Sequence, residues 1–358
     1  MHKVTVESTI TVGSTPIVSG KPHLMSNVLT GELLRSDSMV NGKPFYAMVR
    51  AEPFENIYPS GSPTQRIWII RTGGFGDLLM LTPAIQALLE RGNEVIVACD
   101  QRYQCVFEGF THPNFKVLND PIPAANVKEG DAVVCMEGVI EGSEEARRIH
   151  AVELFAKILD APIITLHLHY SVLPSEEEWA KASLPKEKTR VGIQCKASSP
   201  VRSYNENYLA VVIELLLKNG YEVVLFGAPG DIACDIPGVV NLSNANLTFR
   251  QSCALVATCD AFIAPDSSLA HIAQALHIPL VALFASFPSN LRLTGIRAIT
   301  VAIDAKSECG PCFHHSGSTD GGKWPIEGPC RQAKFCTSLA SISSPRIVDA
   351  VVNLLGGV

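Results

Sequence analysis

The chain has 358 residues, of which 47% are hydrophobic and 18% are charged, so it carries enough apolar material for two folded domains. Its formal net charge of -6 argues against a general nucleic-acid-binding surface, which would need a basic footprint. No uncharged apolar run reaches the roughly 18 residues of a membrane-spanning helix, and the N-terminus has no apolar signal-peptide core. We therefore expect a cytoplasmic protein whose eleven cysteines are mostly buried thiols, unless a group of them binds a metal.

Residues 1–65 are typical of a small β-rich N-terminal module. Residues 4–9 and 44–52 are rich in strand-forming side chains. Between strand-type residues lies Asn41-Gly42, a strong signal for a tight hairpin turn. A stretch rich in Pro, Ser and Gly at 58–63 ends the module.

A strand–turn–helix pattern begins at Arg66 and predicts a first α/β domain over residues 66–185. The predicted elements are a strand at 66–70, a helix at 78–92, and strands at 94–99, 131–137 and 162–166. Continuous apolar strands that alternate with helices indicate a parallel sheet covered on both faces.

The pattern restarts after a polar stretch at 182–188, which predicts a second α/β domain over residues 186–358. Its predicted elements are strands at 190–195, 221–227, 260–265 and 280–285, with helices at 205–220 and 267–279. Two successive units of this kind predict two Rossmann-like domains facing a cleft, because ligands of such sheets bind beyond the carboxyl ends of the strands.

The turn after the first strand of residues 66–185 contains Gly73, Gly74, Gly76 and Asp77. Glycines let the backbone approach a ligand closely, and the N-terminus of the following helix favours anionic groups. The dinucleotide fingerprint fails because its third glycine would be Leu79, although Asp100 would suit a ribose hydroxyl. Asp77 is either a helix N-cap or a base at the mouth of the cleft.

Two further polar stretches follow strands of the second domain. Asp266, Ser267 and Ser268 are good helix caps, yet hydroxyls and helix N–H groups also form a diphosphate site, with His271 one turn inside the helix. In the stretch from Cys195 to Tyr204, the side chains of Lys196, Ser198 and Arg202 either neutralise a leaving diphosphate or form a solvated surface. The sequence alone leaves both pairs of alternatives open.

Four cysteines near the C-terminus have the spacing of a metal site. Cys309 and Cys312 form a C-x2-C pair, and Cys330 and Cys336 follow within a loop rich in Gly. Four thiolates suit a structural Zn or Fe, with His314 and His315 as substitutes. Free thiols or a disulfide are the alternatives.

Together these motifs resemble the heptosyltransferase-type glycosyltransferases, family 9. The first family motif is matched by residues 73–84, which contain Gly76-Asp77 and Thr82-Pro83-Ala84, and the second by residues 266–273. The resemblance covers roughly residues 66–355 and implies a GT-B fold, with an inverting transfer of a heptose-like sugar from an ADP-heptose-like donor. It implies an acceptor that is a glycan, a lipid or a protein, and it is compatible with a homo-oligomer.

The resemblance also implies roles for individual residues. Asp77 would be the base, the helix starting at Ser267 would hold the diphosphate, and Arg202, with Lys196 and Ser198, would offset the charge of the leaving group. The base and ribose of the donor would be contacted by Gly227, Asp231, Leu247 and Thr248. No catalytic metal is needed in this scheme, and relatives that modify autotransporter proteins carry an iron-binding four-cysteine finger.

The chain departs from the family pattern at three places. Ser268 replaces the usual glycine of the second motif, Ser203-Tyr204 follows Arg202 where the family has a Trp-Pro pair after its basic residue, and residues 1–65 are not part of the common core. Three other functions therefore compete with the transferase. One is a sugar-nucleotide epimerase or hydrolase, another is a non-catalytic or degenerate sugar-nucleotide-binding protein with an assembly role, and the third is a transferase acting on modified nucleic acid.

Overall fold

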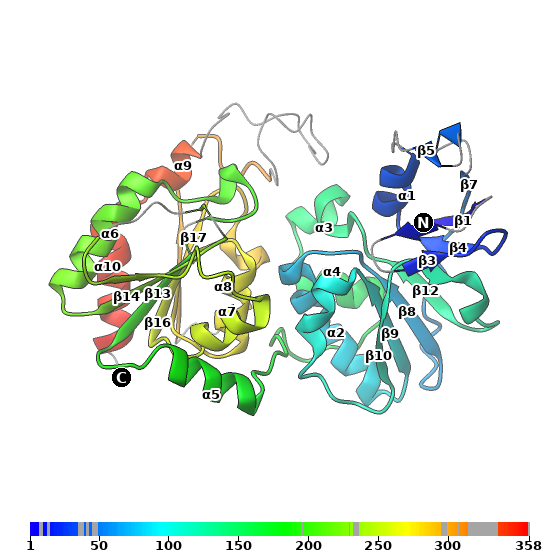
Figure 1. Cartoon of the computed structure of the whole chain (residues 1–358), viewed down its shortest axis with the longest axis horizontal. Helices are drawn as coiled ribbons and strands as arrows, with labels where there is room; N and C mark the ends of the chain where they lie inside the picture. The colour runs from blue at the N-terminus through cyan, green and yellow to red at the C-terminus, as the bar shows by residue number, and fades with distance from the viewer. Residues whose placement is uncertain are drawn as a thin grey trace. The chain divides into compact units, whose positions relative to one another are not determined.

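The structure is a computed structural model, and it divides the chain into two compact units (Figure 1). Unit 1 consists of Met1–Ile140 and Val152–Thr165, and unit 2 consists of Glu141–Ala151 and Leu166–Val358. The described residues are all except 7–9, 13–14, 35–38, 41–42, 45–48, 195, 229, 232–235, 295–298, 307, 314–335 and 357–358. No helix of the described part is both long and apolar enough to cross a bilayer.

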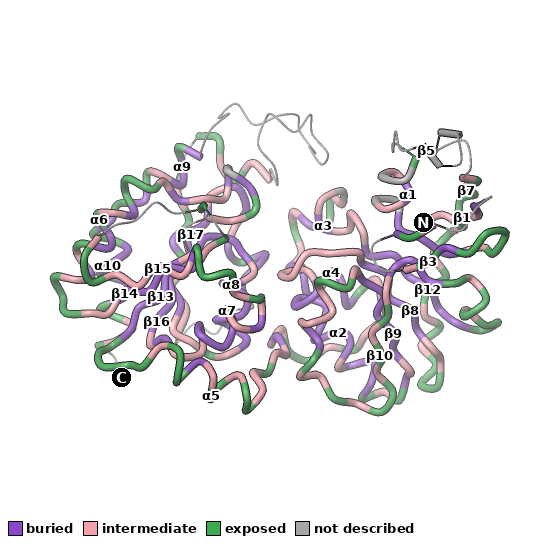
Figure 2. The backbone as a smooth tube through the Cα atoms, viewed as in Figure 1, coloured by how far each residue is buried: buried purple, intermediate pink, exposed green. Residues whose placement is uncertain are grey.

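Unit 1 is built on a four-stranded parallel sheet in the order β10-β9-β8-β12. Its strands are β8 (Arg66–Ile70), β9 (Glu94–Cys99), β10 (Phe115–Asn119) and β12 (Ala132–Cys135). The apolar residues of β8, β9 and β12 are buried, as expected for strands covered on both faces (Figure 2). Helix α2 (Phe75–Glu90) follows β8 and is buried along most of its length.

The N-terminal residues form a second, antiparallel sheet that is part of unit 1. Its order is β11-β4-β1-β7, and the strands are β1 (His2–Val6), β4 (His23–Met25), β7 (Val49–Pro53) and β11 (Ile122–Pro123). Leu24 of β4 packs in one apolar cluster with Trp68 and Ile70 of β8. The N-terminal segment therefore shares its core with the parallel sheet. Its antiparallel sheet also includes β11, which lies in the chain between β10 and β12.

Unit 2 contains a six-stranded, fully parallel sheet in the order β15-β14-β13-β16-β17-β18. The strands are β13 (Arg190–Gln194), β14 (Glu222–Phe226), β15 (Val239–Asn241), β16 (Ala261–Pro265), β17 (Leu280–Phe284) and β18 (Thr300–Asp304). Helices α6 (Glu206–Lys218) and α10 (Ser344–Gly356) cover one face, and α7 (Phe249–Val256) and α8 (Ser268–Ala275) cover the other (Figure 1). The predicted fold class is confirmed: both units are α/β with parallel sheets.

The remaining elements are short. They are β2 (Ile10–Val12), β3 (Thr15–Ile17), β5 (Met39–Val40), β6 (Lys43–Pro44), α1 (Asn27–Leu34), α3 (Val139–Gly142), α4 (Ala151–Ile158), α5 (Pro174–Ser183), α9 (Thr337–Ala340), and the 3-10 helices η2 (Gln101–Phe107), η3 (Ala124–Asn126), η4 (Glu145–Arg147), η5 (Pro200–Arg202) and η6 (Ser289–Leu291). Strands β5 and β6 pair antiparallel on either side of Asn41-Gly42, which itself lies outside the described residues.

The strand predicted at residues 162–166 is wrong. These residues form no strand, and the side chain of Ile164 is 97% exposed. A short apolar run is a weak signal for a strand, because a connecting segment can also contain one.

Residues 166–185, which we expected in the first α/β domain, group with unit 2. There Arg250 of α7 binds the carboxylate of Glu176 of α5 through Nε at 2.5 Å and Nη2 at 2.6 Å.

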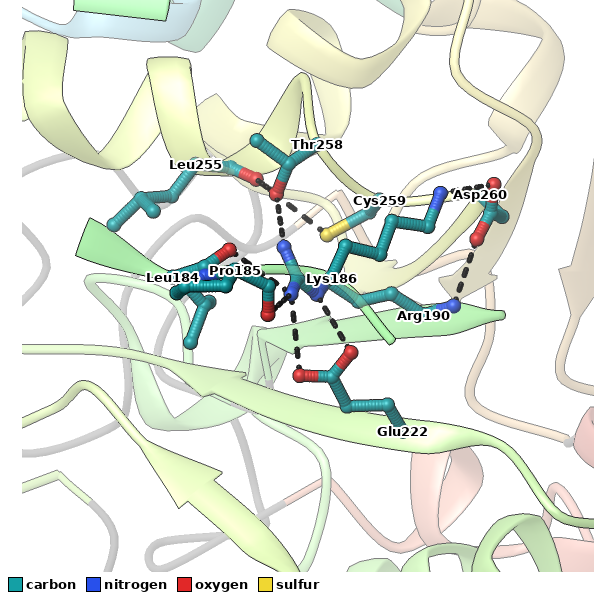
Figure 3. Close-up of polar contacts among 9 residues, drawn as sticks. All are labelled: Leu184, Pro185, Lys186, Arg190, Glu222, Leu255, Thr258, Cys259 and Asp260. Atoms are coloured by element: carbon teal, nitrogen blue, oxygen red, sulfur yellow. Dashed lines mark hydrogen bonds and ion pairs between the residues drawn. The ribbon is translucent and has the colours of Figure 1, made fainter. Parts of the chain in front are cut away.

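A buried arginine fixes the start of the sheet in unit 2 (Figure 3). Arg190, the first residue of β13, is fully buried, and its guanidinium donates to Glu222, Thr258 and the carbonyl oxygens of Leu184 and Pro185. A buried charge is tolerated when it is paired and its donors are satisfied. This network lies at the amino end of the strands and leaves their carboxyl ends for a ligand.

Candidate functional site

The turn between β8 and α2 needs its glycines for steric reasons. Gly74 caps α2 with a φ of 93°, which favours glycine, and a Cβ there would lie 2.5 Å from Asp77 Oδ2. At Gly73 a Cβ would lie 2.6 Å from Cε2 of Tyr103. Gly76 lies in the first turn of the helix. The glycines therefore let the turn close tightly over the carboxylate of Asp77.

Asp77 is held by a buried arginine. Its carboxylate lies 2.5 Å from Nη2 of Arg71, whose side chain is only 3% exposed, whereas that of Asp77 is 24% exposed. The same guanidinium donates to the carbonyl oxygens of Met136 and Gly73, at 2.7 Å and 3.2 Å. Gly74, and not Asp77, occupies the N-cap position. The turn thus presents a half-exposed carboxylate in a fixed orientation.

Three more polar residues surround this turn, and the sequence pattern did not single them out. The backbone N–H of Thr72 donates to the carboxylate of Glu137, and the Thr72 hydroxyl donates to Asp120 Oδ2 at 2.9 Å. The hydroxyl of Ser26 lies 2.8 Å from that of Thr72. Asp120 and Glu137 follow β10 and β12, so the usable signal was their place at the carboxyl ends of parallel strands.

Asp120 is unusual in its burial. Its exposed fraction is 5%, and Oδ1 has no hydrogen-bond partner among the described residues. Burial raises the pKa of Asp120 to about 7, the nearby carboxylate of Glu137 adds to the effect, and the hydrogen bond from Thr72 opposes it. Perturbed carboxyls of this kind gather at functional sites.

Asp100 has a structural role. Its side chain caps η2 by accepting from the backbone N–H of Arg102 at 2.9 Å, and it also pairs with the Arg102 guanidinium. Partial burial of Asp100 raises its pKa, but these hydrogen bonds outweigh that effect and leave the pKa lowered. Both carboxylate oxygens are engaged with Arg102. This arrangement fits the absence of the dinucleotide fingerprint from the sequence.

In unit 2, the loops after β13 and β16 come together around Arg202. Its guanidinium donates to the carbonyl oxygen of Asp266 at 3.0 Å and to Ser198 Oγ at 2.9 Å, and Nη1 lies 3.6 Å from Asp266 Oδ2. Arg202 Nε and Ser199 Oγ are buried without a hydrogen-bond partner among the described residues. Buried polar atoms of this kind are costly unless a ligand or water satisfies them.

The N-terminus of α8 lies in the same place. The hydroxyl of Ser267, the N-cap residue, donates to Gln194 Oε1 at 2.7 Å and makes no capping bond to the helix backbone. Ser268 is half-buried at the first position of α8. His271 is buried, with Nε2 3.9 Å from Asp266 Oδ1. The first-turn N–H groups of a helix have no acceptor within it, so this end is suited to an anion.

Other predicted donor-binding residues make different contacts. Lys196 Nζ lies 2.7 Å from Glu206 Oε1. Thr248 caps α7 in a reciprocal pair with Gln251, next to the half-buried Leu247. The Asp231 carboxylate accepts from the backbone N–H of Ala228, and its Cβ would lie 3.1 Å from a Cβ on Gly227. None of these contacts is made to Arg202, and the donor-binding roles of these residues stay predictions.

The cysteine cluster is described only in part. Cys330, His314 and His315 lie outside the described residues, as does Cys195. Cys336 caps α9 by accepting from Leu339 N at 3.4 Å, and Cys309 Sγ lies 3.3 Å from Ser338 Oγ of the same helix. Cys312 is half-buried. Within the described residues, no group of three or more ligand-type side chains is placed to hold a metal ion.

Comparison with known proteins shows which family the chain is similar to. Residues 147–321 match glycosyltransferase family 9 (heptosyltransferase). Over this segment the chain is similar to the heptosyltransferases of family 9. A curated relative, lipopolysaccharide heptosyltransferase 2 of Salmonella typhimurium, is 30% identical over 141 residues, which cover 36% of this chain and 40% of that protein. The match thus spans about two fifths of the relative's length.

Solved structures of family 9 glycosyltransferases have a similar fold. A family 9 glycosyltransferase from Veillonella parvula superposes with a TM-score of 0.61 at 16% identity, covering 82% of this chain and 98% of that one. TibC from enterotoxigenic E. coli, described as a dodecameric iron-containing heptosyltransferase in complex with ADP-D-beta-D-heptose, gives a TM-score of 0.59 at 13% identity. That alignment covers 99% of this chain and 91% of TibC, so it also includes the N-terminal residues.

Proposed function

We propose that this chain is an inverting glycosyltransferase that moves a heptose-like sugar from a nucleoside diphosphate donor, of the ADP-heptose kind, to an acceptor hydroxyl. The observation that carries the proposal is the carboxylate of Asp77, fixed by Arg71 at 2.5 Å on the turn after β8. In the reaction, the acceptor oxygen bonds to the anomeric carbon while the bond from that carbon to the diphosphate oxygen breaks. The hydroxyl proton passes to Asp77, and the nucleoside diphosphate leaves.

The geometry of unit 1 supports Asp77 as the base. Arg71 holds one carboxylate oxygen, Oδ2, and thereby restricts the position of the group. The acceptor hydroxyl would then approach the other oxygen. A base that is already oriented loses little entropy when the acceptor binds, which favours proton transfer. The acceptor is a hydroxyl of a glycan, a lipid or a protein.

Unit 2 supplies the donor side in this proposal. The diphosphate would accept hydrogen bonds from the N–H groups that open α8 at Ser267 and Ser268, where the helix dipole also favours negative charge. Arg202, positioned by Ser198 and Asp266, would offset the charge that develops on the leaving diphosphate. Gly227, Asp231, Leu247 and Thr248 would contact the nucleoside.

We also propose that Cys309, Cys312, Cys330 and Cys336 bind a structural Zn or Fe. Two of these thiols fit such a site, because Cys309 lies against the helix start that Cys336 caps. The bound metal would cross-link the loop to α9 and take no part in the transfer. Elemental analysis of purified protein should find about one metal per chain, and replacing Cys309 and Cys336 together by Ser should abolish it. Absence of metal from the native protein would contradict this assignment.

Thermal shift with ADP-, GDP-, UDP- and CMP-activated sugars would test the donor class, because a ligand stabilises the folded state according to its occupancy. We expect ADP-heptose to raise the melting temperature more than the other donors. The transfer itself is tested by ADP release from ADP-heptose, which should require an acceptor. No stabilisation by any donor, or ADP release equally fast without an acceptor, would contradict the proposal.

A further inference from the structure

Thr72 joins the turn that carries Asp77 to four other segments of unit 1. Its backbone N–H donates to Glu137, and its carbonyl oxygen accepts from Asp100 N at 2.8 Å. Its hydroxyl contacts both Asp120 and Ser26. Since Thr72 is bonded directly to Arg71, which holds Asp77, any shift of Thr72 moves the carboxylate that we assign as the base.

The hydroxyl contacts form a chain with a defined direction. Ser26 Oγ accepts from the backbone N–H of Leu29 at 3.2 Å. The hydroxyl of Thr72 donates its one proton to Asp120 Oδ2, so it must accept from Ser26. The chain therefore runs from Leu29 N–H through the hydroxyls of Ser26 and Thr72 to the carboxyl of Asp120. Each hydroxyl both donates and accepts, which fixes its rotamer.

Through Ser26, the N-terminal segment takes part in this series of hydrogen bonds. It is fully buried and lies between β4 and α1, directly after a strand whose Leu24 packs against Trp68 and Ile70. Its hydroxyl is thus held by both the antiparallel sheet and the first turn of α1. A sheet and a helix are more precise supports for a site than a mobile loop.

Burying the carboxyl of Asp120 costs more free energy than an acceptor for the Thr72 hydroxyl requires. An uncharged acceptor would serve Thr72 equally well, yet this carboxyl is buried with Oδ1 unsatisfied among the described residues. Such local conflicts are expected where function, and not stability alone, has selected the residue.

We infer that Ser26 and Asp120 are positioning residues for Asp77, which act through Thr72 and make the N-terminal segment part of the machinery for proton abstraction. This inference rests on the proposed role of Asp77 as the base. The β-rich segment then has a function in this chain beyond covering the parallel sheet.

The test compares Ser26→Ala with a matched control, Thr30→Val. Thr30 is equally buried on α1, but its hydroxyl donates only to the carbonyl oxygen of Ser26, at 2.8 Å. In protein labelled with 13C at aspartate carboxyls, the signal of Asp77 is identified by its loss in Asp77→Asn. We expect Ser26→Ala and Asp120→Asn to shift the Asp77 signal, and Thr30→Val to leave it unchanged.

Kinetics provide the second measurement. With ADP-heptose as donor, Ser26→Ala should lower kcat about tenfold with little change in the donor KM, because it misplaces the base without touching the donor site. Ser26→Thr, which restores the hydroxyl, should recover most of the loss. An unchanged Asp77 signal in Ser26→Ala, or the same change in Thr30→Val, would overturn the inference. If the native protein turns over no donor, the proposed function fails, whereas the Asp77 signal still decides whether Ser26 positions it.

Discussion

The turn after β8 in unit 1 and the turn after β16 in unit 2 have the same local architecture and different chemistry. Each joins a buried parallel strand to the N-terminus of a helix, and each contains an aspartate paired with an arginine. In unit 1 the aspartate lies inside the helix and its carboxylate is the exposed member of the pair. In unit 2 the aspartate precedes the helix and both members are largely buried.

This difference determines which ligand each turn suits. A carboxylate at the start of α2 repels anions and attracts the proton of a hydroxyl. At the start of α8 the capping hydroxyl of Ser267 is engaged by Gln194, so the helix N–H groups remain for an anion, next to a fixed guanidinium. In the proposed function, the same strand–turn–helix element therefore carries the base in unit 1 and the anion site in unit 2.

Asp77→Asn should have the largest effect. Loss of the base should lower kcat by about 10²- to 10⁴-fold, while thermal stabilisation by ADP-heptose stays unchanged, since the donor is assigned to unit 2. Asp100→Asn is the matched control, because Asp100 lies beside the same turn but pairs with Arg102. Turnover by Asp77→Asn within a few-fold of the native rate would show that the carboxylate is not the base.

Arg202→Met should affect the donor side and not the base. Loss of a charge-assisted contact to the diphosphate should weaken donor binding by roughly ten- to a hundredfold, measured by titration calorimetry with ADP. Lys196→Met removes a similar charge from a side chain that faces Glu206, and we expect it to weaken binding only a few-fold. An equal loss of ADP affinity in the two variants would contradict the assignment of Arg202, and not Lys196, to the diphosphate.

Much of this comparison was predictable from the sequence, because β8, β14, β16 and β17 are largely apolar runs, and β14 and β16 are followed directly by Gly227 and Asp266. Strand β10 was missed because it lies at the edge of its sheet, where half-buried residues alternate with exposed ones. Asp120, the residue that follows β10, was therefore missed as well. Ser26 had no local signal at all, because its partner Thr72 is 46 positions away and only the tertiary fold brings them together.

Asp120→Asn should change how stability depends on pH. The folded protein keeps this carboxyl protonated up to a pKa of about 7, above its ordinary value of 3.8, so the folded state binds more protons than the unfolded state between these values. The native free energy of unfolding should therefore fall as pH rises from about 4 to about 7, by up to a few kcal/mol. Glu137, Asp100 and Cys99 interact electrostatically with the same carboxyl group.

Urea unfolding at several pH values measures this effect. Asp120→Asn should lack the decline, so that its stability relative to the native protein improves as pH rises. Asp100→Asn is a control of opposite sign, because the lowered pKa of Asp100 stabilises the fold above its ordinary range and this stabilisation is lost as pH falls. Parallel pH profiles for native protein and Asp120→Asn would show that burial does not perturb this carboxyl.

Ser268→Gly should change ADP binding the least of these variants, and the direction of the change is informative. Ser268 is half-buried at the first position of α8, where family 9 relatives are expected to have glycine. If its side chain crowds the diphosphate, glycine should tighten ADP binding by up to about tenfold, against a helix cost of roughly 1 kcal/mol or less. If the hydroxyl instead donates to the diphosphate, Ser268→Gly and Ser268→Ala should both weaken ADP binding. Calorimetry on the two variants separates these outcomes. If crowding is relieved, Ser268→Gly should bind ADP more tightly than Ser268→Ala, although glycine makes the folded protein less stable than alanine does.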